Sequence, residues 1–130
     1  MRPISSSVHS FLDYAVAVVL LVVPIGANFQ EISPVAHWMA IAAGIALFSY
    51  SLLTNYSISW RRLIPLTFHL SLDFVAGVAF ILAPFIFGFG SLAKVFYITM
   101  GVAIVAVVLL TDRSHLARRA KAMPRPGMDN

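Results

Sequence analysis

The sequence predicts an all-α membrane protein of four transmembrane helices, arranged as two helical hairpins of the same design. Hydrophobic residues make up 60% of the 130-residue chain and charged residues only 11%, whereas a soluble domain needs about 25% charged residues to cover its surface. Four apolar segments have the length of about 20 residues that spans a bilayer. The first half of the chain also recurs in the second half at a nearly constant spacing.

The four apolar segments define the predicted helices in order. They cover residues 8–26, 35–54, 67–87 and 92–111. Strands are a poor alternative because the segments show no period-two alternation and because lipid does not tolerate an open sheet edge. Ser5 to Ser7 and Thr67 carry hydroxyls that accept hydrogen bonds from free amides at a helix start. Pro34 fits the first turn of the second helix.

An internal repeat pairs these helices. Residues 7–14 (SVHSFLDY) recur sixty positions later as residues 67–74 (TFHLSLDF), and the second and fourth segments correspond at a spacing of 57. We therefore predict one two-helix repeat in residues 1–57, a second in residues 58–112, and a basic tail in residues 113–130. Two hairpins of the same topology are related by a pseudo-two-fold axis along the membrane normal. The first segment is interpreted as a retained helix and not a signal peptide, because its counterpart is internal.

Basic residues set the predicted orientation. Eight of the nine Lys and Arg residues lie at the chain start, between the second and third segments, or after the fourth; the exception is Lys94. Excess Lys and Arg mark the cytoplasmic side, so both termini and the middle loop are predicted to be cytoplasmic in a multi-pass plasma-membrane protein. Four tail residues are predicted to contact anionic lipid headgroups, at about 1 kcal/mol each: Arg113, Arg118, Arg119 and Lys121. No basic domain supports nucleic-acid binding.

The repeated His-x-x-x-Asp is the main candidate for function. His9 and Asp13 are four residues apart, as are His69 and Asp73, so each pair lies on one helix face. The aspartates lie about a turn past each helix start, near the cytoplasmic interface, where burial costs less than the roughly 2.5–3.5 kcal/mol of the bilayer centre. Because two threonines return to the same level, we predict one polar cluster. Its predicted members are His9, Asp13, Thr54, His69, Asp73 and Thr111.

Three interpretations of this polar cluster compete. In the one we favour, His and Asp side chains clamp the first and third helices together. In the second, the cluster binds or conducts a proton, small ion or solute, because imidazole titrates near neutral pH and polar intramembrane groups often mark pathways. In the third, the donors hold a divalent metal ion or haem iron, although a four-residue His/Asp spacing is not specific for either.

The remaining motifs argue against catalysis. The chain has no cysteine, which excludes disulfides, zinc-thiolate sites and iron–sulfur clusters. It also lacks a nucleophile elbow, a phosphate-binding loop and an HExxH-type motif. We predict a structural or interaction protein, not an enzyme, without a cofactor; the alternative is a transporter or channel component for protons or a small ion. Four short helices bury little surface, so we expect membrane lipids and further copies of the chain as partners.

Small and amphipathic residues suggest where the helices pack and where they leave the membrane. His37 and Trp38 begin the second helix and are interpreted as headgroup anchors. Small residues allow close helix contacts in lipid. The candidate packing positions are Ala40 with Gly44, Ala79 with Ala83, and the group of Gly101, Ala103 and Ala106.

The repeat pattern as a whole resembles a known family. A Leu-Asp-aromatic helix opening, a proline near the outer end, a Gly/Phe loop and a glycine-centred helix ending in Leu-Leu-Thr occur twice. This pattern is similar to the SPW-repeat membrane proteins. The resemblance implies an integral inner-membrane protein of bacteria and a family without an established activity. The name-giving Ser-Pro-Trp is replaced by Val23-Pro24-Ile25 and Ala83-Pro84-Phe85, so that only the proline remains.

Overall fold

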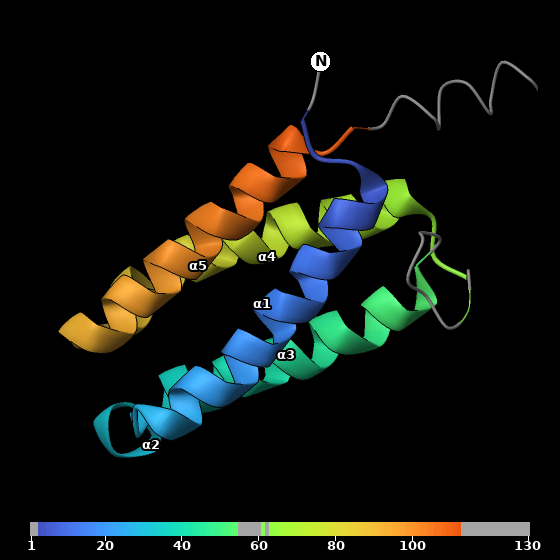
Figure 1. Ribbon diagram of the computed structural model, residues 1–130. Helices are drawn as coiled ribbons and strands as arrows, with labels where there is room; N and C mark the ends of the chain where they lie inside the picture. Colours follow the sequence, from blue (N-terminus) through green and yellow to red (C-terminus); the bar gives the residue numbers. More distant parts are fainter. Residues whose placement is uncertain (1–2, 55–60, 62, 113–130) are drawn as a thin grey trace, which may run out of the picture.

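The computed structural model describes residues 3–54, 61 and 63–112, and it is all-α, with two isolated β-bridges (Figure 1). The helices are α1 (Ser6–Gly26), α2 (Phe29–Ile32), α3 (Pro34–Leu53), α4 (Leu66–Phe87) and α5 (Ser91–Leu110). The four long helices have mean hydropathies between 1.5 and 2.3 and are long enough to cross a membrane. The predicted segments agree with them to within two residues at each end, whereas the short helix α2 was not predicted.

The long helices pair as two hairpins. Helix α1 packs along α3 and helix α4 along α5, while the contacts between the hairpins are far fewer (Figure 1). A Cβ atom added to Gly44 would lie 3.1 Å from the Ala17 carbonyl oxygen, and one added to Gly101 would lie 2.6 Å from the Gly77 carbonyl oxygen. Ala17 and Gly77 are equivalent in the repeat, as are Gly44 and Gly101. Both hairpins therefore close on small residues at the same two positions.

This packing contradicts part of the predicted set of helix-packing positions. Ala40, Gly44, Ala83 and Gly101 are buried as expected, but three of the predicted alanines are exposed: Ala79, Ala103 and Ala106. They share the right spacing but lie on the outer faces of α4 and α5. Gly77, which was not predicted, takes the contact position on α4.

Capping explains where the helices begin. The Ser5 side chain accepts a hydrogen bond from the Val8 amide and caps α1. Ser33 caps α3 in the same way, with Pro34 in the first turn as predicted. Helix α4 instead follows Pro65 and has no side-chain cap, so the prediction that the Thr67 hydroxyl caps this helix start was wrong.

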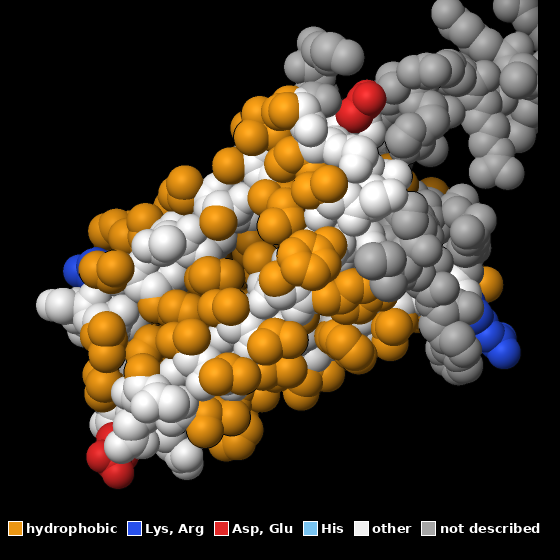
Figure 2. All heavy atoms as spheres, viewed as in Figure 1, with side chains coloured by type: hydrophobic (Ala, Val, Ile, Leu, Met, Phe, Trp, Pro, Cys, Tyr) orange, Lys and Arg blue, Asp and Glu red, His pale blue; other side chains and the backbone are white. Residues whose placement is uncertain are grey.

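The outer surface is apolar and the charged groups lie at its ends. Hydrophobic side chains cover the visible face between the helix ends, with the acidic and basic side chains at its periphery (Figure 2). Large residues such as Val22, Phe85 and Val102 are more than half exposed. A surface of this kind needs lipid or protein around it, which agrees with a multi-pass membrane protein.

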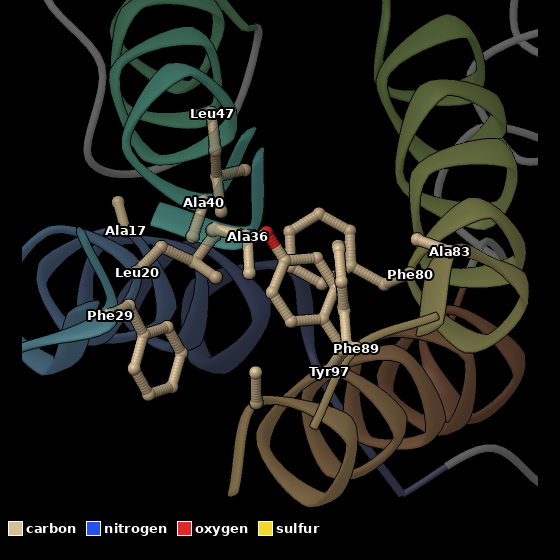
Figure 3. Close-up of a cluster of buried hydrophobic side chains, with 11 residues drawn as sticks. Ala17, Leu20, Phe29, Ala36, Ala40, Leu47, Phe80, Ala83, Phe89 and Tyr97 are labelled. Carbon is tan, nitrogen blue, oxygen red and sulfur yellow. Dashed lines mark hydrogen bonds between the residues drawn. The ribbon is translucent and has the colours of Figure 1, made fainter. Parts of the chain in front are cut away.

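An apolar core joins the two hairpins (Figure 3). The ring of Tyr97 on α5 stacks on Phe80 of α4, with centroids 4.6 Å apart and planes 15° from parallel. Its hydroxyl crosses to the other hairpin and donates to the Ala36 carbonyl on α3 at 2.5 Å. Phe29 and Phe89, equivalent in the repeat, are both buried in this cluster. The core thus places aromatic side chains at the meeting of the hairpins.

Short backbone bridges join the hairpins where α1 and α4 begin. Ile4 pairs with Thr111, and its repeat equivalent Ile64 pairs with Thr54. In the first bridge the Ile4 amide donates to the Leu110 carbonyl at 3.1 Å. Each bridge connects the start of one repeat to the end of the other, as an approximate two-fold axis requires. We call this region of the molecule the bridged end.

Candidate functional site

Two histidines and two aspartates meet between the hairpins near the bridged end. His9 and Asp13 come from α1, and His69 and Asp73 come from the equivalent turns of α4. None of the four residues is more than 6% exposed. We call this group the His/Asp quartet. Their i, i+4 spacing places both members of each pair on the helix face that meets the other hairpin.

Each imidazole of the quartet contacts both carboxylates through the same nitrogen. His69 Nε2 lies 2.8 Å from Asp13 Oδ2 and 3.0 Å from Asp73 Oδ2. His9 Nε2 lies 3.3 Å from each of these oxygens. The two rings meet edge to face with centroids 5.7 Å apart. Contacts across the hairpins are thus as short as those within one helix.

Two threonines bind the opposite nitrogen of each ring. His9 Nδ1 lies 2.7 Å from Thr111 Oγ1, and His69 Nδ1 lies 2.6 Å from Thr54 Oγ1. Each threonine hydroxyl donates its proton to the carbonyl four residues earlier in its own helix, at 2.6 Å. A hydroxyl has one proton, so Oγ1 must accept from Nδ1–H. Both rings therefore carry a proton on Nδ1 and direct Nε2 at the carboxylates.

Tyr50 adds a contact that sequence reasoning missed. Its hydroxyl donates to Asp73 Oδ1 at 2.5 Å, and its ring meets the His69 ring edge to face. The repeat equivalent of Tyr50 is Val107, which has no hydroxyl. The available signal was its position one turn before Thr54, on the same face of α3.

A small cavity, partly open at its mouth, adjoins the quartet. His9, Asp13, Asp73 and Tyr50 form its polar part. All four long helices supply its apolar walls, which include Leu20, Ala43, Leu47, Phe80 and Ile104. A mostly apolar hollow with a few convergent polar groups is the usual form of a binding site.

Two further predictions have different outcomes. His37 is buried, and its Nδ1–H donates to the Pro24 carbonyl at 3.3 Å, so its interpretation as a headgroup anchor was wrong. Trp38 beside it is exposed, as an interfacial anchor would be. The four basic residues predicted to contact headgroups lie outside the described residues: Arg113, Arg118, Arg119 and Lys121.

The fold and site define a class: an all-α protein with four candidate membrane spans, paired as two repeated hairpins around a buried His/Asp cluster. The chain belongs to the SPW repeat domain family, whose model matches residues 7–112. The match covers both hairpins, as the resemblance in the sequence implied. No curated protein and no solved structure is significantly similar to the chain.

Proposed function

We propose that the His/Asp quartet is a clamp that holds the two hairpins together near the cytoplasmic face of the bacterial inner membrane. The observation that carries this proposal is that His9 contacts Asp73 and His69 contacts Asp13, so that both cross pairs join different hairpins. The Thr54 and Thr111 bonds to these imidazoles also cross between hairpins. The protein is then a structural or interaction protein and not an enzyme.

Energetics supports a structural role for the quartet. Hydrogen bonds between membrane helices are each worth about 0.6–2 kcal/mol, whereas removing one partner of a buried ion pair costs about 3–5 kcal/mol. Because the backbones of helices from different hairpins approach closely at few positions, side-chain bonds of this network add substantially to the apolar core and the backbone bridges that also join the hairpins. Loss of a carboxylate should therefore loosen the association of the hairpins and leave the helices themselves formed.

The proposed orientation places the quartet near the cytoplasm. Arg61 lies in the loop between α3 and α4, on the bridged side. Glu31 in α2 and Lys94 near the start of α5 lie at the other end of the long helices. The excess of Arg and Lys in the sequence favours the bridged side as the cytoplasmic one. Lipids and further copies of the chain are the proposed partners of the exposed apolar faces.

Substitution of the two aspartates tests the clamp. Asp13→Asn combined with Asp73→Asn should lower the melting temperature in detergent and leave ion flux across proteoliposomes unchanged. Glu31→Gln removes a carboxylate outside the quartet and should change neither quantity. A flux present in the parent protein and lost in the double variant, with an unchanged melting temperature, would contradict the clamp.

One observation favours a second candidate function, the transport of protons or a small ion. The cavity places three quartet residues at its wall, and ionisable residues inside a membrane protein often mark ion pathways. The remaining walls are apolar, however, and Leu20 and Phe80 supply no polar group to carry an ion further. The geometry therefore supports the clamp better than a continuous pathway.

A further inference from the structure

We propose that the His/Asp quartet binds a divalent transition-metal ion of the Zn²⁺ type between the two hairpins. This inference rests on the proposed clamp, because the same four side chains would hold the ion. It adds a ligand to that clamp: the ion would replace the direct contacts between imidazoles and carboxylates with four bonds to one centre.

The donor atoms already converge. One atom from each of His9, Asp13, His69 and Asp73 lies within 4.8 Å of all the others. In a tetrahedral zinc site with bonds of about 2.0–2.1 Å, neighbouring donors are about 3.3 Å apart. The Nε2–Oδ2 separations are 2.8 to 3.3 Å. These four of the six donor separations therefore lie within about half an ångström of the tetrahedral value.

The threonine contacts prepare both imidazoles as ligands. Because Thr54 and Thr111 accept from the Nδ1–H groups, each ring would give up its Nε2 proton when the ion binds and direct the Nε2 lone pair at the centre of the quartet. Metal-binding histidines almost always donate their other ring N–H to a fixed acceptor. Here each acceptor is itself fixed by its bond to the helix backbone.

The Asp73 carboxylate is oriented in a comparable way. Tyr50 donates to Asp73 Oδ1, which leaves Oδ2 as the oxygen that faces both Nε2 atoms. Without an ion, two imidazolium rings balance the two carboxylates; when a divalent ion displaces the two Nε2 protons into solvent, its two positive charges balance them instead. Burial of unbalanced charge is costly, so a divalent cation fits this point because the exchange leaves the net charge of the site unchanged.

The donor set also selects among metal ions. Two nitrogens and two oxygens suit zinc and its neighbours in the first transition row, whereas Ca²⁺ takes six to eight oxygens and Mg²⁺ an octahedron of them. Haem iron does not fit, because the two carboxylate oxygens lie within 3.3 Å of both Nε2 atoms, in the space that a porphyrin ring would need.

Metal titration of the purified full chain tests the inference. After treatment with chelator and its removal, Zn²⁺ is titrated by calorimetry and Co²⁺ by visible absorption, since tetrahedral Co²⁺ absorbs strongly. We expect one ion per chain and the spectrum of a tetrahedral nitrogen/oxygen site. Asp73→Asn should abolish stoichiometric binding, whereas Glu31→Gln should leave it unchanged. A parent protein that binds no ion, or an Asp73→Asn variant that binds equally well, would overturn the proposal.

A second variant keeps the test decisive if Asp73→Asn does not fold. Thr111→Val keeps all four ligands and removes the acceptor of His9 Nδ1–H, so metal affinity should fall by about 10- to 100-fold. An unchanged affinity would contradict the proposed role of the threonines. Melting temperatures measured in chelator separate the two proposals. Stability lost in Asp13→Asn without metal, together with no metal uptake by the parent, supports the clamp alone; metal uptake with unchanged stability supports the metal site alone.

Discussion

The two hairpins are built alike around the quartet but differ in the layer beside it. The second hairpin packs Leu66, Leu70 and Val108 into a small apolar cluster. At the equivalent positions the first hairpin has three serines: Ser6, Ser10 and Ser51. Among the described residues, the buried hydroxyls of Ser10 and Ser51 have no hydrogen-bond partner. The repeat thus preserves the quartet and its threonines while the packing around them varies.

A second difference concerns the tyrosines. Tyr50 of the first repeat supports the quartet, and its equivalent is Val107; Tyr97 of the second repeat ties the core together, and its equivalent is Ala40. Each tyrosine donates from its own hairpin to an acceptor in the other. Each hairpin therefore supplies one hydroxyl contact to its partner, at different depths. Substitutions should change stability alike where the two repeats have the same residue, and differently where their residues differ.

The largest expected effect is at the symmetric quartet. Asp13→Asn and Asp73→Asn should each lower the free energy of unfolding by about 3–5 kcal/mol, because each leaves two buried histidines to share one carboxylate. The cost of the double variant should differ from the sum of the two single costs, since both aspartates contact the same two histidines. Unfolding in a denaturing detergent, followed by circular dichroism, measures all three values. Strict additivity would show that the four residues do not act as one network.

Substitution of the contact glycines should destabilise the two hairpins to different extents. Gly101→Ala places a Cβ 2.6 Å from the Gly77 carbonyl oxygen, a backbone atom, whereas Gly44→Ala first meets the Leu21 side chain at 3.0 Å. Overpacking costs about 1–3 kcal/mol, and we expect Gly101→Ala near the upper value and Gly44→Ala near the lower. The same unfolding assay ranks them, with Gly26→Ala as control because nothing lies within 4 Å of its added Cβ. A reversed order would mean that α1 and α3 are the more tightly packed pair.

The sequence predicted the parts of this molecule that depend on composition or on repetition. The spans follow from length and hydropathy, and the quartet follows from i, i+4 spacing combined with the repeat. Tyr50 was missed because a repeat reveals only positions where both copies agree, and Val107 does not. Gly77 was missed for the same reason, since its equivalent is Ala17.

The sequence also did not predict which face of each helix meets a neighbouring helix. Ala79, Ala103 and Ala106 have the spacing of packing residues but face outward, because spacing does not say which neighbour a helix face meets. His37 lies at a helix start, where headgroup anchors are common, yet it is buried and donates to the Pro24 carbonyl. Helix α2 has four residues, too few for any periodic pattern.

The smallest expected effect concerns the buried serines and has the opposite sign. A buried hydroxyl without a partner costs about 1–3 kcal/mol, and its removal is neutral or stabilising. Ser10→Ala and Ser51→Ala should therefore each raise the free energy of unfolding, by about 1 kcal/mol. Ser49→Ala is the matched control on α3: its exposed hydroxyl donates to the Ile45 carbonyl, so its removal should have almost no effect.

A loss of stability in Ser10→Ala or Ser51→Ala would contradict the expected difference between the hairpins. It would mean that these hydroxyls have a favourable partner in the membrane, such as a bound water molecule or a second copy of the chain. Cross-linking of the parent and variant proteins in the same membranes distinguishes these partners, because only a second copy changes the oligomer distribution. If both variants gain stability as expected, the serines make the first hairpin the less stable of the two beside the quartet, and the leucine and valine of the second hairpin make it the firmer support for His69 and Asp73.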